Sequence, residues 1–426
     1  MLNRSLAALL SSVLLGALFI GAPTSVRAGS TIYVGPGRGS GGCASPDYQT
    51  NGSADNAEIS SAADEAVSGD TIFLCAGTFH FNEQVVLDVV AAGNNLTFQG
   101  AGKGVTVLDA DGSTTRFFHA QDVSLTFRDL TMQNGSSGDY VGVVWGEGTT
   151  NFNIQRSAFK NNYASSGMGV IFSRNGSITV TDSIFDSNYS DGSDYEYGGG
   201  AIQARGETAL VTVRNSVFTN NYSTTYGGAI QAYGPVVISG STFIDNESDD
   251  DGGAIAVYGD LQVSGSKFSG NITHSEGASI YVECNTRMQV TGSIFNGNHA
   301  VGNSADGAAF NIDCDSDSDI LINRNIFSNN TAGDNGGAID EDAGELMVVT
   351  NNRFIKNSSG DDGGAIWANY IRMTQNVFIG NTSEICGGAV YVDETDFGTA
   401  RSNTYSANRG RVGGVREMNV CFWTPK

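Results

Sequence analysis

Residues 227–255 read GGAIQAYGPVVISGSTFIDNESDDDGGAI, and this stretch contains one complete unit of a repeat. Two motifs define the unit: Gly-Gly-Ala-Ile at Gly227–Ile230, and Phe-x-x-Asn at Phe243–Asn246. The first motif then returns at Gly252–Ile255. A repeat of 20–50 residues is typical of a solenoid, in which each unit packs only on its neighbours.

Both motifs recur along most of the chain, and they alternate in order. The aromatic residue of Phe-x-x-Asn returns at a mean spacing near 27 residues, at Phe159, Phe185, Phe218, Phe243, Phe268, Phe295, Phe327, Phe354, Phe378 and, as a last copy, Tyr405. Gly-Gly-Ala-Ile or a close variant lies at 199–202, 227–230, 252–255, 277–280, 307–310, 336–339, 363–366 and 387–390.

The repeating unit is predicted to be β-structured. Short runs such as Val236–Ile238 are rich in β-branched residues and are bounded by Gly, Asn and Ser, whereas no helix-length amphipathic pattern recurs. The sequence therefore predicts an all-β parallel β-helix over residues 70–412, with coils stacked about 4.8 Å apart. Phenylalanines in register would stack inside, and asparagines in register would hydrogen-bond to one another and to turn backbone.

The two ends of the chain have other patterns. Residues 1–28 contain a positive charge at Arg4, then an apolar run, and end with a small residue suited to cleavage. This pattern predicts a secretory signal peptide, and a membrane anchor is the alternative. Residues 29–69 are predicted to form a strand, a loop and a capping helix. The helix is expected over 57–67, with Ile59, Ala62, Ala63, Ala66 and Val67 on its buried face and Asp55 and Glu58 as a capping box. Residues 413–426 are expected to cap the other end.

All six cysteines lie in the exported part, so an oxidising compartment favours disulfides. Cys284 and Cys314 occupy the same place in successive repeats, which predicts a bond between them; two buried free thiols are the alternative. Cys43–Cys75 and Cys386–Cys421 would then staple the two ends. No Cys-x-x-Cys pair indicates a zinc site.

Composition limits the partners. The chain has 426 residues and a formal net charge of −23, which repels phosphate backbones and argues against nucleic-acid binding. No second apolar segment is long enough to span a bilayer, so no membrane span is expected in the mature chain. The expected location is extracellular or at the cell surface, and the expected partner is an extracellular glycan or a host or cell-surface component.

The alternating motifs resemble the repeat of the chlamydial polymorphic outer membrane proteins. The segment from the helix through Gly69–Leu74 and Ala76–Phe79 looks like the entry of pectin-lyase-like right-handed β-helices. This resemblance covers roughly residues 55–415 and implies a right-handed coil and a secreted or surface-displayed passenger, often in adhesion. Those relatives end in a membrane β-barrel, and this sequence stops about 18 residues after Asn408.

Strand alternation predicts which side chains face outward after each Gly-Gly-Ala-Ile. The first outward column is Gln203, Gln231, Ala256, Tyr281, Asn311, Asp340, Trp367 and Tyr391. The second is Arg205, Tyr233, Tyr258, Glu283, Asp313, Asp342, Asn369 and Asp393. Aromatic rings stack on sugars and carboxylates accept hydroxyl hydrogen bonds, so a glycan-binding face is predicted at Tyr233, Tyr258, Tyr281, Glu283, Asp313, Asp340, Asp342, Trp367 and Tyr391. Simple β propensity would give the same aromatics.

Acidic residues leave a catalytic alternative open. Glu283, Asp313 and Asp342 would lie about 5 Å apart in successive coils, which is the carboxylate separation of retaining glycosidases. No Gly-His-Gly or Arg-x-Lys set is present, the four histidines lie at unrelated repeat positions, and no catalytic residue is assigned. Three hypotheses for the function therefore remain. The protein is an adhesin or carbohydrate-binding protein, a polysaccharide lyase or glycosidase, or a structural surface component.

Loops before the glycines carry a further acidic set. Its members are Asp249, Asp250, Asp251, Asp361 and Asp362, with Asp334 between them. Stacked loops would line one edge with carboxylates, which predicts at most a weak Ca²⁺ site; solvated turn residues are the alternative. No other cofactor is expected.

Overall fold

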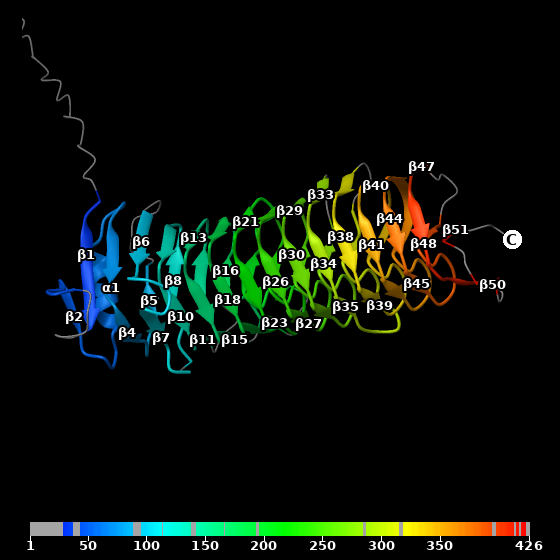
Figure 1. Cartoon of the computed structure of the whole chain (residues 1–426). Helices are drawn as coiled ribbons and strands as arrows, with labels where there is room; N and C mark the ends of the chain where they lie inside the picture. The colour runs from blue at the N-terminus through cyan, green and yellow to red at the C-terminus, as the bar shows by residue number, and fades with distance from the viewer. Residues whose placement is uncertain are drawn as a thin grey trace, which may run out of the picture.

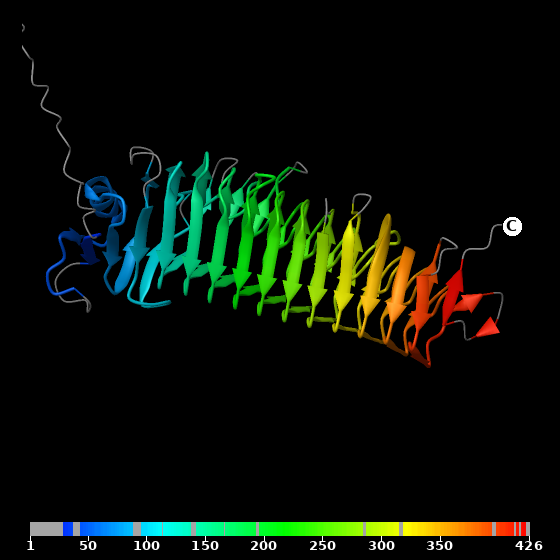
Figure 2. The ribbon, with the colours of Figure 1, turned by 90° about the horizontal axis from the view of Figure 1, so that it is seen from above.

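The computed structural model describes residues 29–36, 43–87, 95–112, 114–137, 142–165, 167–192, 196–283, 287–314, 318–393, 398–412, 415–416 and 419–422. These residues form an elongated rod, along which the chain advances steadily from one end to the other (Figure 1). Seen from above, successive strands lie side by side across the rod (Figure 2). The predicted signal peptide lies outside the described residues.

Three parallel sheets run along the rod. The long sheet has 26 described strands: β1 (Thr31–Pro36), β2 (Tyr48–Thr50), β3 (Thr71–Leu74), β5 (Val85–Val86), β6 (Asn95–Gln99), β8 (Phe118–Gln121), β9 (Ser124–Arg128), β12 (Val144–Glu147), β13 (Asn151–Gln155), β16 (Ile171–Ser173), β17 (Ile178–Thr181), β20 (Ile202–Ala204), β21 (Val211–Arg214), β24 (Ile230–Ala232), β25 (Val236–Ser239), β28 (Ile255–Val257), β29 (Leu261–Ser264), β32 (Ile280–Val282), β33 (Arg287–Thr291), β36 (Phe310–Ile312), β37 (Asp319–Asn323), β40 (Ile339–Thr350), β43 (Ile366–Thr374), β46 (Val390–Val392), β47 (Gly398–Arg401) and β51 (Val420–Phe422).

The second sheet has 13 described strands: β4 (Gly77–His80), β7 (Thr106–Asp109), β10 (Thr131–Gln133), β14 (Ala158–Lys160), β18 (Ile184–Asp186), β22 (Val217–Thr219), β26 (Thr242–Ile244), β30 (Lys267–Ser269), β34 (Ile294–Asn296), β38 (Ile326–Ser328), β41 (Arg353–Ile355), β44 (Val377–Ile379) and β48 (Thr404–Ser406). The third has ten: β11 (Ser136–Ser137), β15 (Tyr163–Ser165), β19 (Tyr189–Asp191), β23 (Tyr222–Ser223), β27 (Glu247–Ser248), β31 (Ile272–Thr273), β35 (His299–Ala300), β39 (Thr331–Ala332), β42 (Ser358–Ser359) and β45 (Thr382–Ser383). A short antiparallel pair, β49 (Arg411–Val412) and β50 (Val415–Arg416), stands apart.

Each coil contributes to all three sheets in turn. In one coil the chain passes through β24 and β25, then β26, then β27, and the next coil begins at β28. Every strand of the coil pairs in parallel with its counterpart one coil on, so Phe218 lies opposite Phe243 and Phe243 opposite Phe268. The fold class and the register predicted from the repeat are therefore confirmed.

The repeat motifs form two stacks inside the rod. Rings of successive Phe-x-x-Asn copies lie 4.7–5.1 Å apart and within 2–11° of parallel, from Phe159 to Tyr405. The asparagines, from Asn162 to Asn408, each donate from Nδ2 to Oδ1 of the next at 2.8–3.0 Å. Because these buried amides are paired, the ladder they form stabilises the stack without leaving a polar group unsatisfied.

A second polar ladder runs two residues before each aromatic ring, and the sequence analysis did not predict it. It passes from Ser157 to Ser293 and continues as asparagine to Asn403, and each backbone N–H donates to the next side-chain oxygen at 2.8–3.2 Å. The residue ahead of each ladder position adopts a left-handed conformation, as at Asn215 (φ +48°) and Asn220 (φ +53°). These residues turn the chain sharply from one sheet into the next.

The helix α1 (Asn56–Glu65) lies at the N-terminal end of the rod (Figure 1). Ile59, Ala62 and Ala63 are buried against the first coils, as predicted. Two expectations are wrong: the helix stops at Glu65, so Val67 is 47% exposed, and the N-cap makes no side-chain capping bond. The Asp55 carboxylate instead accepts from the backbone N–H groups of Gly52 and His80, which ties the helix to β4.

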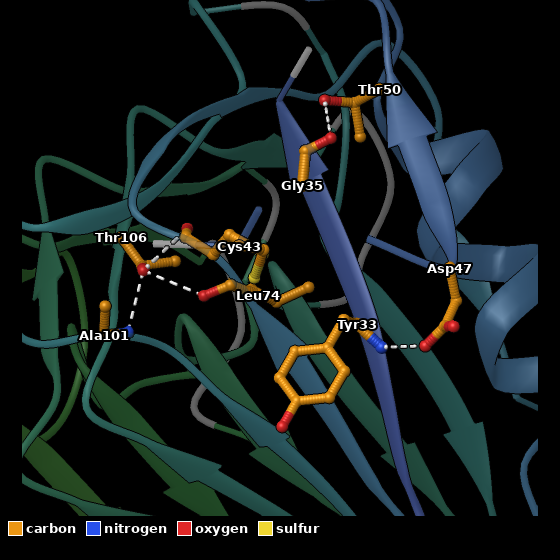
Figure 3. Close-up of a disulfide and its surroundings, with 9 residues drawn as sticks. Tyr33, Gly35, Cys43, Asp47, Thr50, Leu74, Ala101 and Thr106 are labelled. Carbon is orange, nitrogen blue, oxygen red and sulfur yellow. Dashed lines mark hydrogen bonds between the residues drawn. A yellow bond between two sulfur atoms is a disulfide. The ribbon is translucent and has the colours of Figure 1, made fainter. Parts of the chain in front are cut away.

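Disulfides join the terminal coils, as predicted for both ends. Cys43 bonds Cys75 with the Cα atoms 5.7 Å apart, beside the hydrogen bonds of Thr106 and Thr50 (Figure 3). Cys386 bonds Cys421, Cα to Cα 5.8 Å. Cys314 is buried and disulfide-bonded, but its predicted partner Cys284 lies outside the described residues. The long sheet extends to β1, which pairs with β3, and to β51, which pairs with β46.

Candidate functional site

The first outward column forms a continuous file on the long sheet, here called the central file. Pairing places Gln203, Gln231, Ala256, Tyr281, Asn311, Asp340, Trp367 and Tyr391 opposite one another in successive coils. Their strand positions point away from the interior. Even so, Gln203, Gln231, Ala256, Asn311 and Asp340 are at most 4% exposed. Neighbouring side chains and loops must therefore cover the file.

The second outward column lies beside the central file, here called the second file. Its backbone follows the same register, because Tyr258 N–H donates to Ala232, Glu283 N–H to Val257 and Asp313 N–H to Val282. Glu283, Asp313 and Asp342 are exposed, whereas Arg205, Tyr233, Tyr258, Asn369 and Asp393 are half-buried. The predicted second-file residues are thus brought together along one edge.

A third file borders the central file on its other side. It consists of the residues directly before the glycine pairs, here called the pre-glycine file: Tyr226, Asp251, Glu276, Asp306, Asn335, Asp362 and Cys386. The first glycine of each pair has φ between +56° and +72° where the structure describes it. A Cβ at Gly252 would lie 2.4 Å from the Ile255 carbonyl oxygen, so only glycine permits this turn. The turn holds the pre-glycine residue close to the outward side of the strand that follows.

Side chains of the pre-glycine file also bind its backbone. The Asp251 carboxylate accepts from the Glu276 N–H at 3.0 Å, and Asp306 accepts from the Asn335 N–H at 2.6 Å. Asp362 accepts from the Cys386 N–H at 2.8 Å. These bonds fix one carboxylate oxygen in every second loop of the file. The central, second and pre-glycine files together are called the strip.

Four tyrosines from all three files meet in the middle of the strip. The rings of Tyr233 and Tyr258 stack at 5.0 Å, and Tyr258 meets Tyr226 and Tyr281 edge to face at 6.2 and 6.1 Å. All four are half-buried. This tyrosine cluster continues toward the C-terminal end as the Trp367–Tyr391 pair, whose rings lie parallel at 6.3 Å.

Between these aromatic groups lies a carboxyl cluster made of Glu276, Asp306 and Asp340, with Asp313 and Asp342 at its edge. Burial, and then the charges of Asp251 and Asp306, raise the pKa of Glu276 to about 7. Burial raises the pKa of Asp306 to about 6. The pKa of Asp340 is raised well above its ordinary value by burial and by Asp306 and Asp342, and no described group hydrogen-bonds its Oδ2.

The cluster therefore holds protonated and ionised carboxyls side by side near neutral pH. A protonated carboxyl donates a hydrogen bond and an ionised one accepts. With ring faces on either side, this arrangement matches what hydroxyl-bearing ligands require.

The five residues of the predicted Ca²⁺ site are not gathered in one place. Asp251 and Asp362 lie in the pre-glycine file four coils apart, and Asp361 precedes Asp362. Asp249 and Asp250 precede Asp251 in its loop, and Asp249 is exposed on the third sheet's side. A Ca²⁺ site there stays a prediction.

Sequence reasoning identified Asp251 and Asp362 of the pre-glycine file as acidic loop residues, but it missed Tyr226, Glu276 and Asp306. The residue type at this place changes from coil to coil, so no motif marks it. Counting back one position from each glycine pair would have aligned the file.

Comparison with known families supports the same architecture. Residues 143–317 match the right handed beta helix region, and residues 326–340 match the Chlamydia polymorphic membrane protein repeat. The first match covers most of the tyrosine and carboxyl clusters.

Similarity to individual proteins is lower. The probable autotransporter YfaL of Escherichia coli (strain K12) is 27% identical over 128 residues, which cover 26% of this chain and 10% of that protein. The chain thus matches about a tenth of the relative's length. The catalytic unit of an α-1,3-glucanase from Streptomyces thermodiastaticus superposes with a TM-score of 0.45 at 15% identity, covering 82% of this chain and 66% of the other. A PL6 alginate lyase superposes with a TM-score of 0.47 at 13% identity, covering 90% and 85%.

The parallel pairing, the ladders and the two family matches agree with one another. The repeats seen first in the sequence stack one coil on the next. The chain is a right-handed parallel β-helix protein with repeats of the chlamydial polymorphic membrane protein type.

Proposed function

We propose that this protein is displayed on a cell surface or secreted, and that it binds carbohydrate along the strip. The autotransporter relative, the polymorphic membrane protein repeat and the disulfides support an extracellular location. The described part of the chain contains no helix with the length and apolar character needed to cross a bilayer.

The observation that carries the proposal is the tyrosine cluster directly beside the carboxyl cluster. Half-buried rings at 5–6 Å offer rigid apolar faces on which the C–H faces of sugar rings stack. The adjacent carboxyls supply donors and acceptors for hydroxyl groups. A solenoid presents both in a line, so several successive sugar units can bind at once.

The charge of the strip narrows the ligand class. Between Tyr226 and Asp393 its three files contain no Lys, Arg or His, while Asp251, Glu276, Glu283, Asp306, Asp313, Asp340, Asp342, Asp362 and Asp393 are acidic. Polyuronates and sulfated chains would be repelled. Neutral and amino-sugar polymers are therefore the expected ligands.

A glycan array with neutral, amino-sugar and uronate polymers tests this proposal. The triple variant Tyr258→Ala/Tyr281→Ala/Trp367→Ala should lose at least tenfold in affinity, whereas Tyr281→Phe keeps the ring and should retain binding. Tyr163→Ala/Tyr189→Ala is the matched control, because these rings stack at 5.0 Å on the third sheet, away from the strip. Unchanged binding in a folded triple variant, or a preference for uronates, would contradict the proposal.

A polysaccharide-cleaving enzyme is the second candidate, and the carboxyl cluster favours it. A general acid needs a proton at the working pH, and the raised pKa values of Glu276 and Asp306 provide one. Exposed Asp313 and Asp342 lie in successive coils, and the generic strand spacing of about 4.8 Å is close to the carboxyl separation of about 5–5.5 Å in retaining glycosidases. New reducing ends from a neutral polysaccharide, lost in Asp313→Asn, Asp342→Asn or Glu276→Gln, would establish catalysis. Glycan binding without the release of new reducing ends would contradict the enzyme and support the adhesin hypothesis.

A further inference from the structure

A second group of functional side chains lies on the third sheet, away from the strip. Glu247 begins β27 and Asp249 follows two residues later, so strand alternation directs both outward. β27 pairs with β31 so that Ser248 lies opposite Thr273, which places His274 directly over Asp249 in the next coil. Backbone hydrogen bonds from Asp249 N–H to Ser223 and from His274 N–H to Ser248 hold this register.

The three side chains converge. One ligand atom from each of Glu247, Asp249 and His274 lies within 4.8 Å of the other two, and this is the only such trio of His, Cys, Asp or Glu among the described residues. His274 Nε2 is 3.1 Å from Glu247 Oε1. Ligands bonded at about 2.0–2.1 Å in a tetrahedral site lie about 3.3 Å apart, so this pair already has the required spacing.

A neighbouring coil orients the third ligand. The Tyr222 hydroxyl hydrogen-bonds the Asp249 carboxylate, and Tyr222 lies opposite Glu247 in the sheet. Such outer contacts fix ligating carboxylates in known metal sites. The His274 and Glu247 side chains are 48% and 41% exposed, so an ion can reach them from solvent.

We propose that Glu247, Asp249 and His274 bind a first-row divalent cation of the Zn²⁺ type. One imidazole nitrogen with two carboxylate oxygens suits Zn²⁺ and its neighbours, whereas Ca²⁺ prefers oxygen ligands alone. Three protein ligands leave the remaining positions to water. Because the ligands come from two coils, a bound ion would clamp those coils together.

Calorimetric titration of the full chain with ZnCl₂ tests the site. We expect one saturable Zn²⁺ equivalent, weakened at least tenfold in His274→Ala and in Glu247→Gln, and little binding of CaCl₂. The matched control is His299→Ala, an exposed histidine one coil further along the same sheet. The described cysteines are all in disulfides, so none of them offers a competing thiolate.

Two further readouts keep the result unambiguous. Zn²⁺ should raise the thermal midpoint of the wild type and of His299→Ala but not of His274→Ala, and Co²⁺ should give a visible absorption band that depends on His274. No saturable binding, equal affinity in His274→Ala, or loss of binding in His299→Ala would overturn the proposal.

Discussion

The asparagine ladder and the strip are both files of polar side chains repeated once per coil, but their energetics are opposite. In the ladder, Asn221, Asn246 and Asn271 are fully buried, and each amide donates to the next. In the strip, Asp340 is 4% exposed and its Oδ2 has no described hydrogen-bond partner. Stacking about 5 Å apart suits neutral amides, which both donate and accept, whereas it forces carboxylates to repel or to bind protons. The ladder therefore stabilises the fold, whereas the crowded carboxylates of the strip destabilise it when they are ionised.

The largest effect is expected from breaking the ladder. Asn221→Ala removes the donor to Phe185 O and to Asn246 Oδ1, and leaves the Asn188 N–H without its acceptor. Buried groups left unpaired should lower the free energy of unfolding by about 3 kcal/mol. Chemical denaturation checks this.

The control for that variant is the adjacent Asn220→Gly. Asn220 is exposed and has φ +53°, where glycine fits, so a change within about 0.5 kcal/mol is expected. Equal losses in the two variants would mean that the ladder bonds contribute little.

The next effect concerns pH. The pKa values of Glu276 and Asp306 are raised to about 7 and about 6 in the folded protein, so the folded state holds protons that the unfolded chain releases. Their contribution is fully present below about pH 4 and is lost as the pH rises through 6 and 7. Stability should fall by about 2 kcal/mol between pH 5 and 8, a value reduced for solvent screening.

Thermal melts across that pH range provide the measurement. Glu276→Gln/Asp306→Asn should flatten the dependence, whereas Asp245→Asn, an exposed acid at a left-handed turn, should not. A wild-type protein that is equally stable at pH 5 and 8 would show that the cluster does not hold those protons.

A smaller effect is expected at the buried acid itself. Asn311 occupies the preceding position of the central file and is 4% exposed, so an amide fits in Asp340→Asn. The raised pKa of Asp340 means that its ionised form destabilises the fold. The variant should be more stable than the wild type at pH 8 and equally stable at pH 4. Asp313→Asn, at an exposed place, should gain less, and denaturation at both pH values separates them.

The smallest effect is that of salt. Raising NaCl from 0.1 to 1 M shortens the screening length from about 10 to about 3 Å, which weakens repulsion in the strip and across a chain of net charge −23. The thermal midpoint of the wild type should rise by about 2 °C. The midpoint of Asn221→Ala should rise equally, because the asparagine side chain that this variant removes carries no charge. A smaller rise is expected in Glu276→Gln/Asp306→Asn; an identical rise would assign the effect to overall charge alone.

The fold could be predicted because its determinants are fixed in type. Phe and Asn recur at one place in each coil, and their alternation with Gly-Gly-Ala-Ile sets the register by itself. The second ladder escaped prediction because its members change from Ser157 through Ser293 to Asn325 and beyond. Serine and asparagine accept the same backbone bond, so the chemistry is constant while the residue type is not.

The candidate site was predictable only in part. Strand alternation identified Tyr258, Tyr281 and Asp313, because the side-chain period of a strand is two. It could not show that Asp340 is buried, because the side-chain period of a strand says only which way a residue points, and not what packs over it. The helix end at Glu65 was missed for a similar reason: Asp70 accepts a hydrogen bond from the Val67 N–H and draws that residue out of helical geometry.

The disulfides at the two ends have a consequence for the resistance of the rod to proteolysis. An interior coil is held by neighbours on both sides, but a terminal coil has only one, so fraying and proteolysis of a solenoid begin at its tips. Cys43–Cys75 and Cys386–Cys421 close loops at those two places. Loss of these two bonds should therefore open the tips of the rod to proteases before its interior coils.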